Sequence, residues 1–197
     1  MRHHPTPASG PGDAGPAPTP VGAAGRRRSG PRTNGARRPA ARFVVTFLGY
    51  WCAGLLLIAL VPALAGVAVH ATVLTFSRLL ALLRWPHQVA DSVFLLGGVA
   101  LEIVTDCTPL MPVVAFVSAV LAYPARASSR LAACVAGLVI LSGFNLARLL
   151  VLAVVLDRAP WLFEFLHVYL WQTMTLFVVF MLFAGWLRTL AARVDAA

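Results

Sequence analysis

The chain has 197 residues, of which 59% are hydrophobic and only 12% are charged. Soluble globular domains carry roughly a quarter of charged residues, so this composition predicts a membrane protein. All 16 basic residues are arginines, and half of them lie within residues 1–42 while the others are scattered among apolar segments. Nucleic-acid-binding proteins gather their basic residues on one surface. Nucleic acid is therefore not expected as a partner, despite the net charge of +9.

Residues 1–42 contain eight prolines, seven glycines and eight arginines, with a single acidic residue. Such a segment buries too little apolar surface to offset the entropy lost on ordering, so we expect a disordered tail. Its arginines lead directly into an apolar run, and arginine is enriched on the cytoplasmic side of membrane helices. The tail is therefore predicted to be cytoplasmic. A twin-arginine export signal at Arg37 and Arg38 competes with this interpretation, but the Pro-Ala-Ala-Arg that follows does not continue such a signal.

The rest of the chain, residues 43–197, is predicted to be a membrane-embedded domain of the all-α polytopic class. We expect about four transmembrane helices, at residues 43–65, 110–123, 131–156 and 162–187. The first has 23 residues and no charge, more than the ~20 residues that a bilayer requires. Pro62 is expected to kink it near its end. The second is short and is followed by Pro124.

Residues 69–84 are also largely apolar, but they are interrupted by two arginines, a histidine and several hydroxyl side chains. This mixed pattern predicts a helix that lies along the outer membrane surface. A further transmembrane span is the alternative. That span would place Cys107 on the cytoplasmic side and would break the arginine bias of the loops.

Two short apolar runs flank Gly97 and Gly98, a dipeptide typical of a hairpin turn. In the second run, residues 99–105, side chains of two kinds alternate in the manner of a strand. We therefore predict a short β-hairpin at the membrane face that ends close to Cys107. An irregular loop is the alternative.

Residues 105–112 (Thr-Asp-Cys-Thr-Pro-Leu-Met-Pro) stand where a polar stretch meets an apolar segment. Thr108 is a candidate N-cap and Pro109 a candidate first helical residue, which puts Cys107 just ahead of a helix N-terminus. The positive end of a helix favours the nucleophilic thiolate, whereas an inert buried cysteine is the alternative. The other two cysteines lie inside apolar runs, and no cluster has metal-ligand spacing. Neither a metal nor a disulfide is expected.

Two further polar residues are predicted to lie at the same membrane level as Cys107. The positive-inside rule places Arg130 and Arg188 at the cytoplasmic face. Eighteen residues separate Arg130 from Arg148 and 21 separate His167 from Arg188. These separations are about 27 Å and 31 Å of helix, close to the thickness of the hydrocarbon layer. Arg148 and His167 are thus expected at the outer face.

These three residue types fit a cysteine transpeptidase. A thiolate at Cys107 would attack a peptide carbonyl, and His167 would take the thiol proton and return it to the leaving amine. Arg148 would stabilise the oxyanion. Asn145, one turn earlier on the same helix, would orient Arg148 or the substrate. Taken singly, Arg148 could instead snorkel to the interface, and His167 could be a structural residue.

Three short segments together resemble the exosortase/archaeosortase family, and most of all a short, minimal exosortase. They are residues 106–108 (Asp-Cys-Thr), 145–148 (Asn-Leu-Ala-Arg) and 165–172 (Phe-Leu-His-Val-Tyr-Leu-Trp-Gln). The resemblance covers roughly residues 43–190. It implies a multi-pass enzyme of the bacterial inner membrane with a periplasmic active site and no cofactor. It also implies exported protein substrates that end in a short motif such as Pro-Glu-Pro, a transmembrane helix and a basic cluster.

By this resemblance the catalytic residues are Cys107, Arg148 and His167. The candidate substrate-binding or orienting residues are Asn145, Thr108, Trp171 and Gln172. One position departs from the family pattern, because Pro109 stands where the family usually has glycine. Proline has no backbone N–H, so this position offers no oxyanion donor. The competing function is a non-catalytic membrane subunit of a transport or assembly complex, in which the polar residues would be contacts between packed helices. Membrane lipid is expected around the protein with either function.

Overall fold

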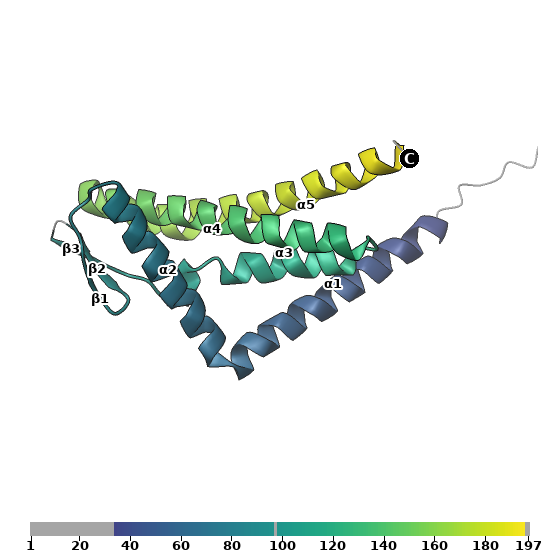
Figure 1. The fold of residues 1–197 in the computed structure, drawn as a ribbon, viewed down its shortest axis with the longest axis horizontal. Coiled ribbons are helices and arrows are strands. Elements are labelled where there is room, and N and C mark those ends of the chain that lie inside the picture. The colour runs from purple at the N-terminus through teal and green to yellow at the C-terminus, as the bar shows by residue number, and fades with distance from the viewer. Residues whose placement is uncertain (1–33, 97, 196–197) are drawn as a thin grey trace, which may run out of the picture.

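The computed structural model describes residues 34–96 and 98–195. Its α-helices are α1 (Asn34–Leu60), α2 (Pro62–Leu82), α3 (Leu110–Ala122), α4 (Ala127–Arg158) and α5 (Trp171–Asp195). A 3-10 turn, η1 (Thr105–Cys107), precedes α3, and α5 is preceded by the 3-10 turn η2 (Pro160–Leu162) and the π-helical segment η3 (Phe165–Leu170). Helices α3, α4 and α5 lie side by side along the long axis, and α1 and α2 form a V next to them (Figure 1).

The first helix begins earlier than the composition predicts. Disorder over residues 1–42 is wrong for the last part of that range, because α1 already begins at Asn34. Alanine and arginine, which dominate this part of the sequence, are strong helix formers. A helix that the apolar segment has already nucleated can also extend at little cost. Residues 1–33 lie outside the described residues, so for them the predicted tail stays a prediction.

Pro62 separates two helices instead of kinking one. The predicted helix over residues 43–65 is wrong at its end, since α1 stops at Leu60 and Pro62 is the first residue of α2. Proline lacks the N–H that a helix interior needs but fits the first turn of a new helix. The residue before it, Val61, is displaced from helical geometry (φ −123°, ψ 78°). The chain turns sharply at this point (Figure 1).

Helix α2 covers residues 69–82 of the helix predicted at residues 69–84, ends two residues earlier than predicted, and extends back to Pro62. Its buried side chains belong to its second half, where Val73, Phe76 and Leu80 pack with the sheet and with the late part of α4. The beginning of α1 lies at the other end of the molecule (Figure 1). Helix α2 therefore continues away from the start of α1 and does not return to it.

Four helical segments of the described chain are long and apolar enough to cross a membrane. They are Ala40–Leu60, Pro62–Leu82, Ala127–Arg158 and Pro160–Ala192. The expected number is met, but α2 qualifies in place of the span predicted at residues 110–123. Helix α3 has 13 residues, about 20 Å, which is less than the ~30 Å of the hydrocarbon layer. It is packed among α1, α4 and α5.

The predicted β-hairpin is present, and the sheet is larger than expected. Strands β2 (Val93–Leu96) and β3 (Val99–Glu102) pair antiparallel around the turn at Gly98, whose φ of 100° suits glycine. An unpredicted strand, β1 (Gln88–Ala90), pairs with the other side of β2, so that the order is β1-β2-β3. One face of this sheet is buried, and there Phe94 meets Phe76 of α2 edge-on at 5.1 Å.

Two buried clusters mark the two ends of the molecule. At the sheet end, side chains from α2, the sheet, η1 and late α4 form one cluster, which contains Cys107 and Leu149. At the aromatic end, α1, α3, early α4 and late α5 meet. There the rings of Phe43, Tyr123 and Phe183 contact one another at centroid distances of 5.9–6.5 Å.

Candidate functional site

Cys107 ends a 3-10 turn and is only 5% exposed. Helix α3 begins at Leu110 with Pro109 as its N-cap, one residue later than the sequence predicts. Thr108 still stabilises this junction, because its hydroxyl donates to the Thr105 carbonyl (2.7 Å) and accepts from the Leu110 N–H (3.3 Å). Thr108 is buried in this turn and does not line the cavity described below. These two hydrogen bonds fix the shape of the loop, which agrees with the prediction that Thr108 orients its neighbours.

The backbone N–H groups of Cys107 and of the residue after it are already occupied. The N–H of Cys107 donates to the Val104 carbonyl (2.9 Å) and that of Thr108 to the Thr105 carbonyl (3.0 Å). Pro109 has no N–H to offer. None of these three positions therefore presents a free N–H to an oxyanion.

Asn145 holds the loop from the side of α4. Its amide Nδ2 donates to the Cys107 carbonyl at 2.8 Å, and the bond is buried. The sequence predicts that Asn145 orients Arg148 or the substrate, but the structure gives it the cysteine backbone as its partner. A buried hydrogen bond that links positions 38 residues apart fixes the loop to the helix, because breaking it would leave a polar group unsatisfied.

The side chains of Arg148 and His167 are in contact, so the structure brings together two of the residues predicted to lie at one level. The guanidinium Nη2 of Arg148 lies 3.5 Å from Nδ1 of His167. A guanidinium has no acceptor atom, so this contact uses the lone pair of Nδ1 and leaves the ring proton on Nε2. Within the described residues, the buried Nε of Arg148 has no hydrogen-bond partner. The guanidinium is thus only partly engaged.

The backbone at His167 is π-helical over Phe165–Leu170. Segments of this kind are rare and occur frequently at functional sites. The ring of Phe163 stacks on the imidazole, with centroids 5.5 Å apart and planes at 7°. The sequence analysis missed Phe163, although an aromatic residue four positions before a helical histidine is a signal for such a contact.

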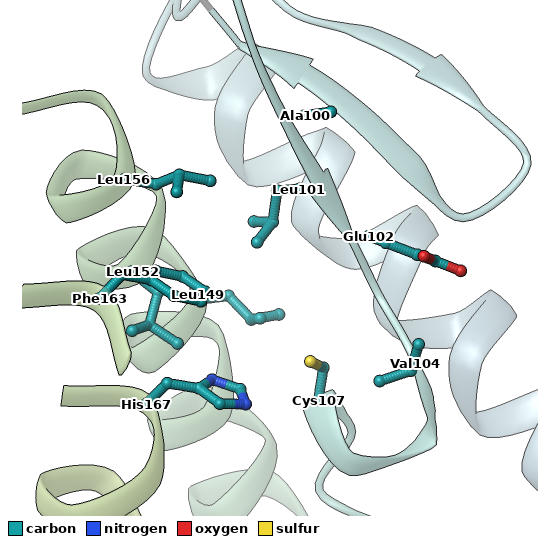
Figure 2. A pocket seen from close by; sticks show the side chains of 10 residues that line it. All are labelled: Ala100, Leu101, Glu102, Val104, Cys107, Leu149, Leu152, Leu156, Phe163 and His167. Carbon is teal, nitrogen blue, oxygen red and sulfur yellow. The ribbon is translucent and has the colours of Figure 1, made fainter. Parts of the chain in front are cut away.

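Cys107 and His167 line one cavity of about 290 Å³, from opposite sides (Figure 2). The lining side chains are mostly apolar and come from β3, the loop after it, α4 and the segment before α5: Ala100, Leu101, Glu102, Val104, Cys107, Leu149, Leu152, Leu156, Phe163 and His167. The sulfur and the imidazole both point into this space. An apolar cavity with few polar groups that converge on it is typical of a ligand-binding site.

The remaining candidates lie outside this cavity. The ring of Trp171 packs edge-on against Phe144 at 5.6 Å, and its buried indole N–H has no partner within the described residues. Gln172 is exposed. Both residues lie about one turn beyond His167, whereas the segment around the histidine contributes Phe163 and His167 itself to the cavity wall. No side chain of Trp171 or Gln172 reaches the site.

Charged groups that the sequence analysis did not assign surround the site. Asp106 lies within electrostatic range of both Arg148 and His167, and Glu164 lies within range of His167. Glu102 is the carboxylate on the cavity wall. Among the residues that the structure describes, no group of three or more His, Cys, Asp or Glu is arranged to hold a metal ion.

The fold and the four long apolar helices of the described chain indicate a multi-pass, mostly helical membrane protein with a small sheet at one end. No protein-family model, no curated protein and no solved structure matches the chain. Any assignment of function therefore depends on the geometry of the site and on the motifs.

Proposed function

We propose that this protein is a membrane-embedded cysteine peptidase or transpeptidase of the exosortase type. The observation that supports this most is the shared cavity of Cys107 and His167, with Arg148 in contact with the imidazole. The three side chains come from three separate elements, η1, η3 and α4. A nucleophile and a proton carrier that line one apolar cavity, with a cation in contact with the proton carrier, are the parts that acyl transfer requires.

In the proposed reaction the Cys107 sulfur attacks a peptide carbonyl and forms a thioester, while the C–N bond breaks and the amine leaves with a proton. In the resting contact Arg148 occupies the lone pair of Nδ1. Once Arg148 turns from Nδ1 to the substrate, His167 takes the thiol proton, and the resulting imidazolium then gives this proton to the leaving amine. Water or an acceptor amine then attacks the thioester and releases the product.

Arg148 is the proposed oxyanion donor. The neighbouring N–H groups of Cys107 and Thr108 are bonded within the turn, and Pro109 has none. The incompletely bonded guanidinium of Arg148 contacts the imidazole. Turned toward a carbonyl held in the apolar cavity, such a donor would stabilise the developing negative charge far more than it would in water.

The proposed substrates are exported proteins with a C-terminal motif, a transmembrane helix and a basic cluster, and the proposed location is the bacterial inner membrane. In this orientation the sheet end faces the periplasm. Arginines at the aromatic end support it, because Arg130 and Arg188 are close in sequence to Ser129 and Trp186, which are hydrogen-bonded to each other beside the aromatic-end cluster.

Cysteine labelling tests the orientation. In a variant whose Cys52, Cys107 and Cys134 are replaced by alanine, Leu95→Cys on the exposed sheet face should react with a membrane-impermeant maleimide in intact spheroplasts. Arg188→Cys should react only after lysis. The reverse pattern would refute a periplasmic site.

Co-expression with a tagged exported reporter that carries the tripartite tail tests the activity. The reporter should lose its tail with the wild-type protein and keep it with Cys107→Ala at equal membrane levels, and Cys107→Ser should be nearly inactive because a hydroxyl lacks thiolate character. Cys134→Ala, in the cluster at the aromatic end, is the control and should process normally. Normal processing by Cys107→Ala would favour a non-catalytic membrane subunit.

A further inference from the structure

Strand β3 has one free edge, and that edge borders the cavity. In the order β1-β2-β3, β3 pairs with β2 only. Three consecutive residues of the strand, Ala100, Leu101 and Glu102, line the cavity. Since successive side chains point to opposite faces of a sheet, a space that contacts all three lies along the edge of the strand and not over one face.

The register shows which backbone groups this edge presents. The N–H of Ile103 donates to the Ser92 carbonyl (2.9 Å), directly continuing the pairing of Val93 with Glu102. Residues opposite each other in an antiparallel pair alternate between hydrogen-bonded and non-hydrogen-bonded pairs. Leu101 therefore bonds to β2, whereas the N–H and C=O groups of Ala100 and Glu102 point to the free edge. Among the described residues, no other backbone hydrogen bond outside the helices and the sheet uses them.

We propose that the free edge of β3 binds the substrate backbone, as a fourth strand that delivers the scissile carbonyl to Cys107. The strand leads through a short loop into the turn that ends at Cys107, so a peptide aligned with it reaches the sulfur. The segment before the scissile carbonyl runs parallel to β3. Backbone pairing of this kind supplies affinity independently of sequence, and the apolar walls select the side chains.

This inference rests on the proposed function, and it is tested with three reagents on the purified full-length protein. The first is a short apolar peptide with a C-terminal vinyl sulfone. The Cys107 sulfur adds to the terminal vinyl carbon and the thiol proton moves to the neighbouring carbon. The second is the same peptide with alternate backbone amides N-methylated, which cannot pair with an edge. The third is iodoacetamide, which needs only a reactive thiol.

The wild-type protein should react with the first peptide roughly fivefold or more faster than with the N-methylated one, the effect of losing an ordinary hydrogen bond or more. Ala100→Pro and Glu102→Pro remove an N–H from the free edge without touching the pairing with β2, and they should abolish the preference. Val89→Pro is the matched control. By the same alternation its N–H lies on the outer edge of β1, away from the cavity, and the preference should remain.

Equal rates for the two peptides on the wild-type protein, with Cys107 still alkylated by iodoacetamide, would overturn strand pairing and leave the nucleophile intact. Loss of the preference in Val89→Pro as well would also overturn it, because the effect would then come from the sheet as a whole. Failure of all three reagents to label Cys107 would overturn the nucleophile and the strand pairing together. The comparison on the wild-type protein decides the question even where a proline variant does not fold.

Discussion

The two ends of the molecule are built differently from the same helices. At the aromatic end, regular helices pack through rings and through glycines, such as Gly137, where an added Cβ would collide with the Phe116 ring. At the sheet end, the backbone is irregular: a 3-10 turn precedes α3, a π-helical segment precedes α5, and β3 has a free edge. Helix α4 runs through both (Figure 1). It contributes small and apolar residues at one end and Asn145 and Arg148 at the other.

On the proposed function, the residues of α4 that stabilise the fold and those that take part in the reaction lie on different halves of the helix. Regular helices satisfy their own backbone groups, which is what a lipid environment demands. Among the described residues, buried side-chain nitrogens without a hydrogen-bond partner occur on both halves of α4, at Arg130 Nε and Arg148 Nε. Only at the sheet end do a thiol and an imidazole, Cys107 and His167, line a cavity in the part of the chain that the structure describes. Substitutions at the sheet end should therefore change activity at little cost in stability, and substitutions at the aromatic end should do the opposite.

The largest effect of this comparison is expected at His167. His167→Ala should lower processing of the tail-bearing reporter at least ~10²-fold, the low end for general acid–base catalysis, while the protein still accumulates. The control is His70→Ala, an exposed histidine of α2. Near-full activity of His167→Ala, measured as the ratio of processed to full-length reporter, would remove His167 from the mechanism.

Arg148 comes next. A guanidinium offers a planar fork of donors, whereas an ammonium is a point charge with a different reach. Arg148→Lys should therefore insert normally but process the reporter at least ~10-fold more slowly, and Arg148→Ala should be inactive, because one oxyanion donor contributes roughly 10²–10³ in rate. Arg158→Lys, at an exposed position, serves as control. Wild-type rates for Arg148→Lys would make Arg148 a snorkelling residue.

Asn145 connects the two kinds of effect, because it fixes the cysteine loop without lining the cavity that Cys107 and His167 share. Asn145→Asp removes the donor to the Cys107 carbonyl and faces it with another acceptor, at a cost of about 1–3 kcal/mol. Alkylation of Cys107 by iodoacetamide should change in rate, and the melting temperature in detergent should fall. Ser142→Ala, one turn earlier on α4, should leave both unchanged. An unaltered alkylation rate in Asn145→Asp would show that the loop does not depend on this bond.

The smallest effect on activity is expected at Gly137. Gly137→Ala forces the Phe116 ring to move, and overpacking of this kind costs about 1–3 kcal/mol. The melting temperature in detergent should fall while the activity of the folded fraction is kept. Gly143→Ala is the matched control on the same helix, because its Cβ would meet open space. Equal melting temperatures for the two variants would contradict the tight packing of α3 on α4.

Much of the architecture is local in origin and could be predicted. Hydropathy alone indicates helices that can cross a membrane, and the turn at Gly98 predicts the hairpin, because both depend on residues that are neighbours in the sequence. Helix lengths predict that Arg148 and His167 reach one level, and the two side chains do meet at 3.5 Å. Depth along a helix follows from a fixed rise per residue.

Other features depend on contacts between segments far apart in the sequence. Hydropathy cannot tell whether Pro62 bends one helix or separates two, or that α3 is a short helix packed among its neighbours, because both outcomes bury similar residues. Strand β1 has only three residues, too few for a periodic signal. It forms by hydrogen bonding to the side of β2 that β3 leaves unpaired.

The candidate site likewise has features that the sequence predicts and features that depend on tertiary packing. The residue types and the levels of Cys107, Arg148 and His167 could be read from the sequence. The partner of Asn145, the stacking of Phe163 and the exclusion of Trp171 could not, because side-chain direction depends on the rotation of each helix about its axis. At His167 the π-helical segment changes that rotation. Only the packing of α4, α5 and the sheet against one another decided which polar groups share a cavity.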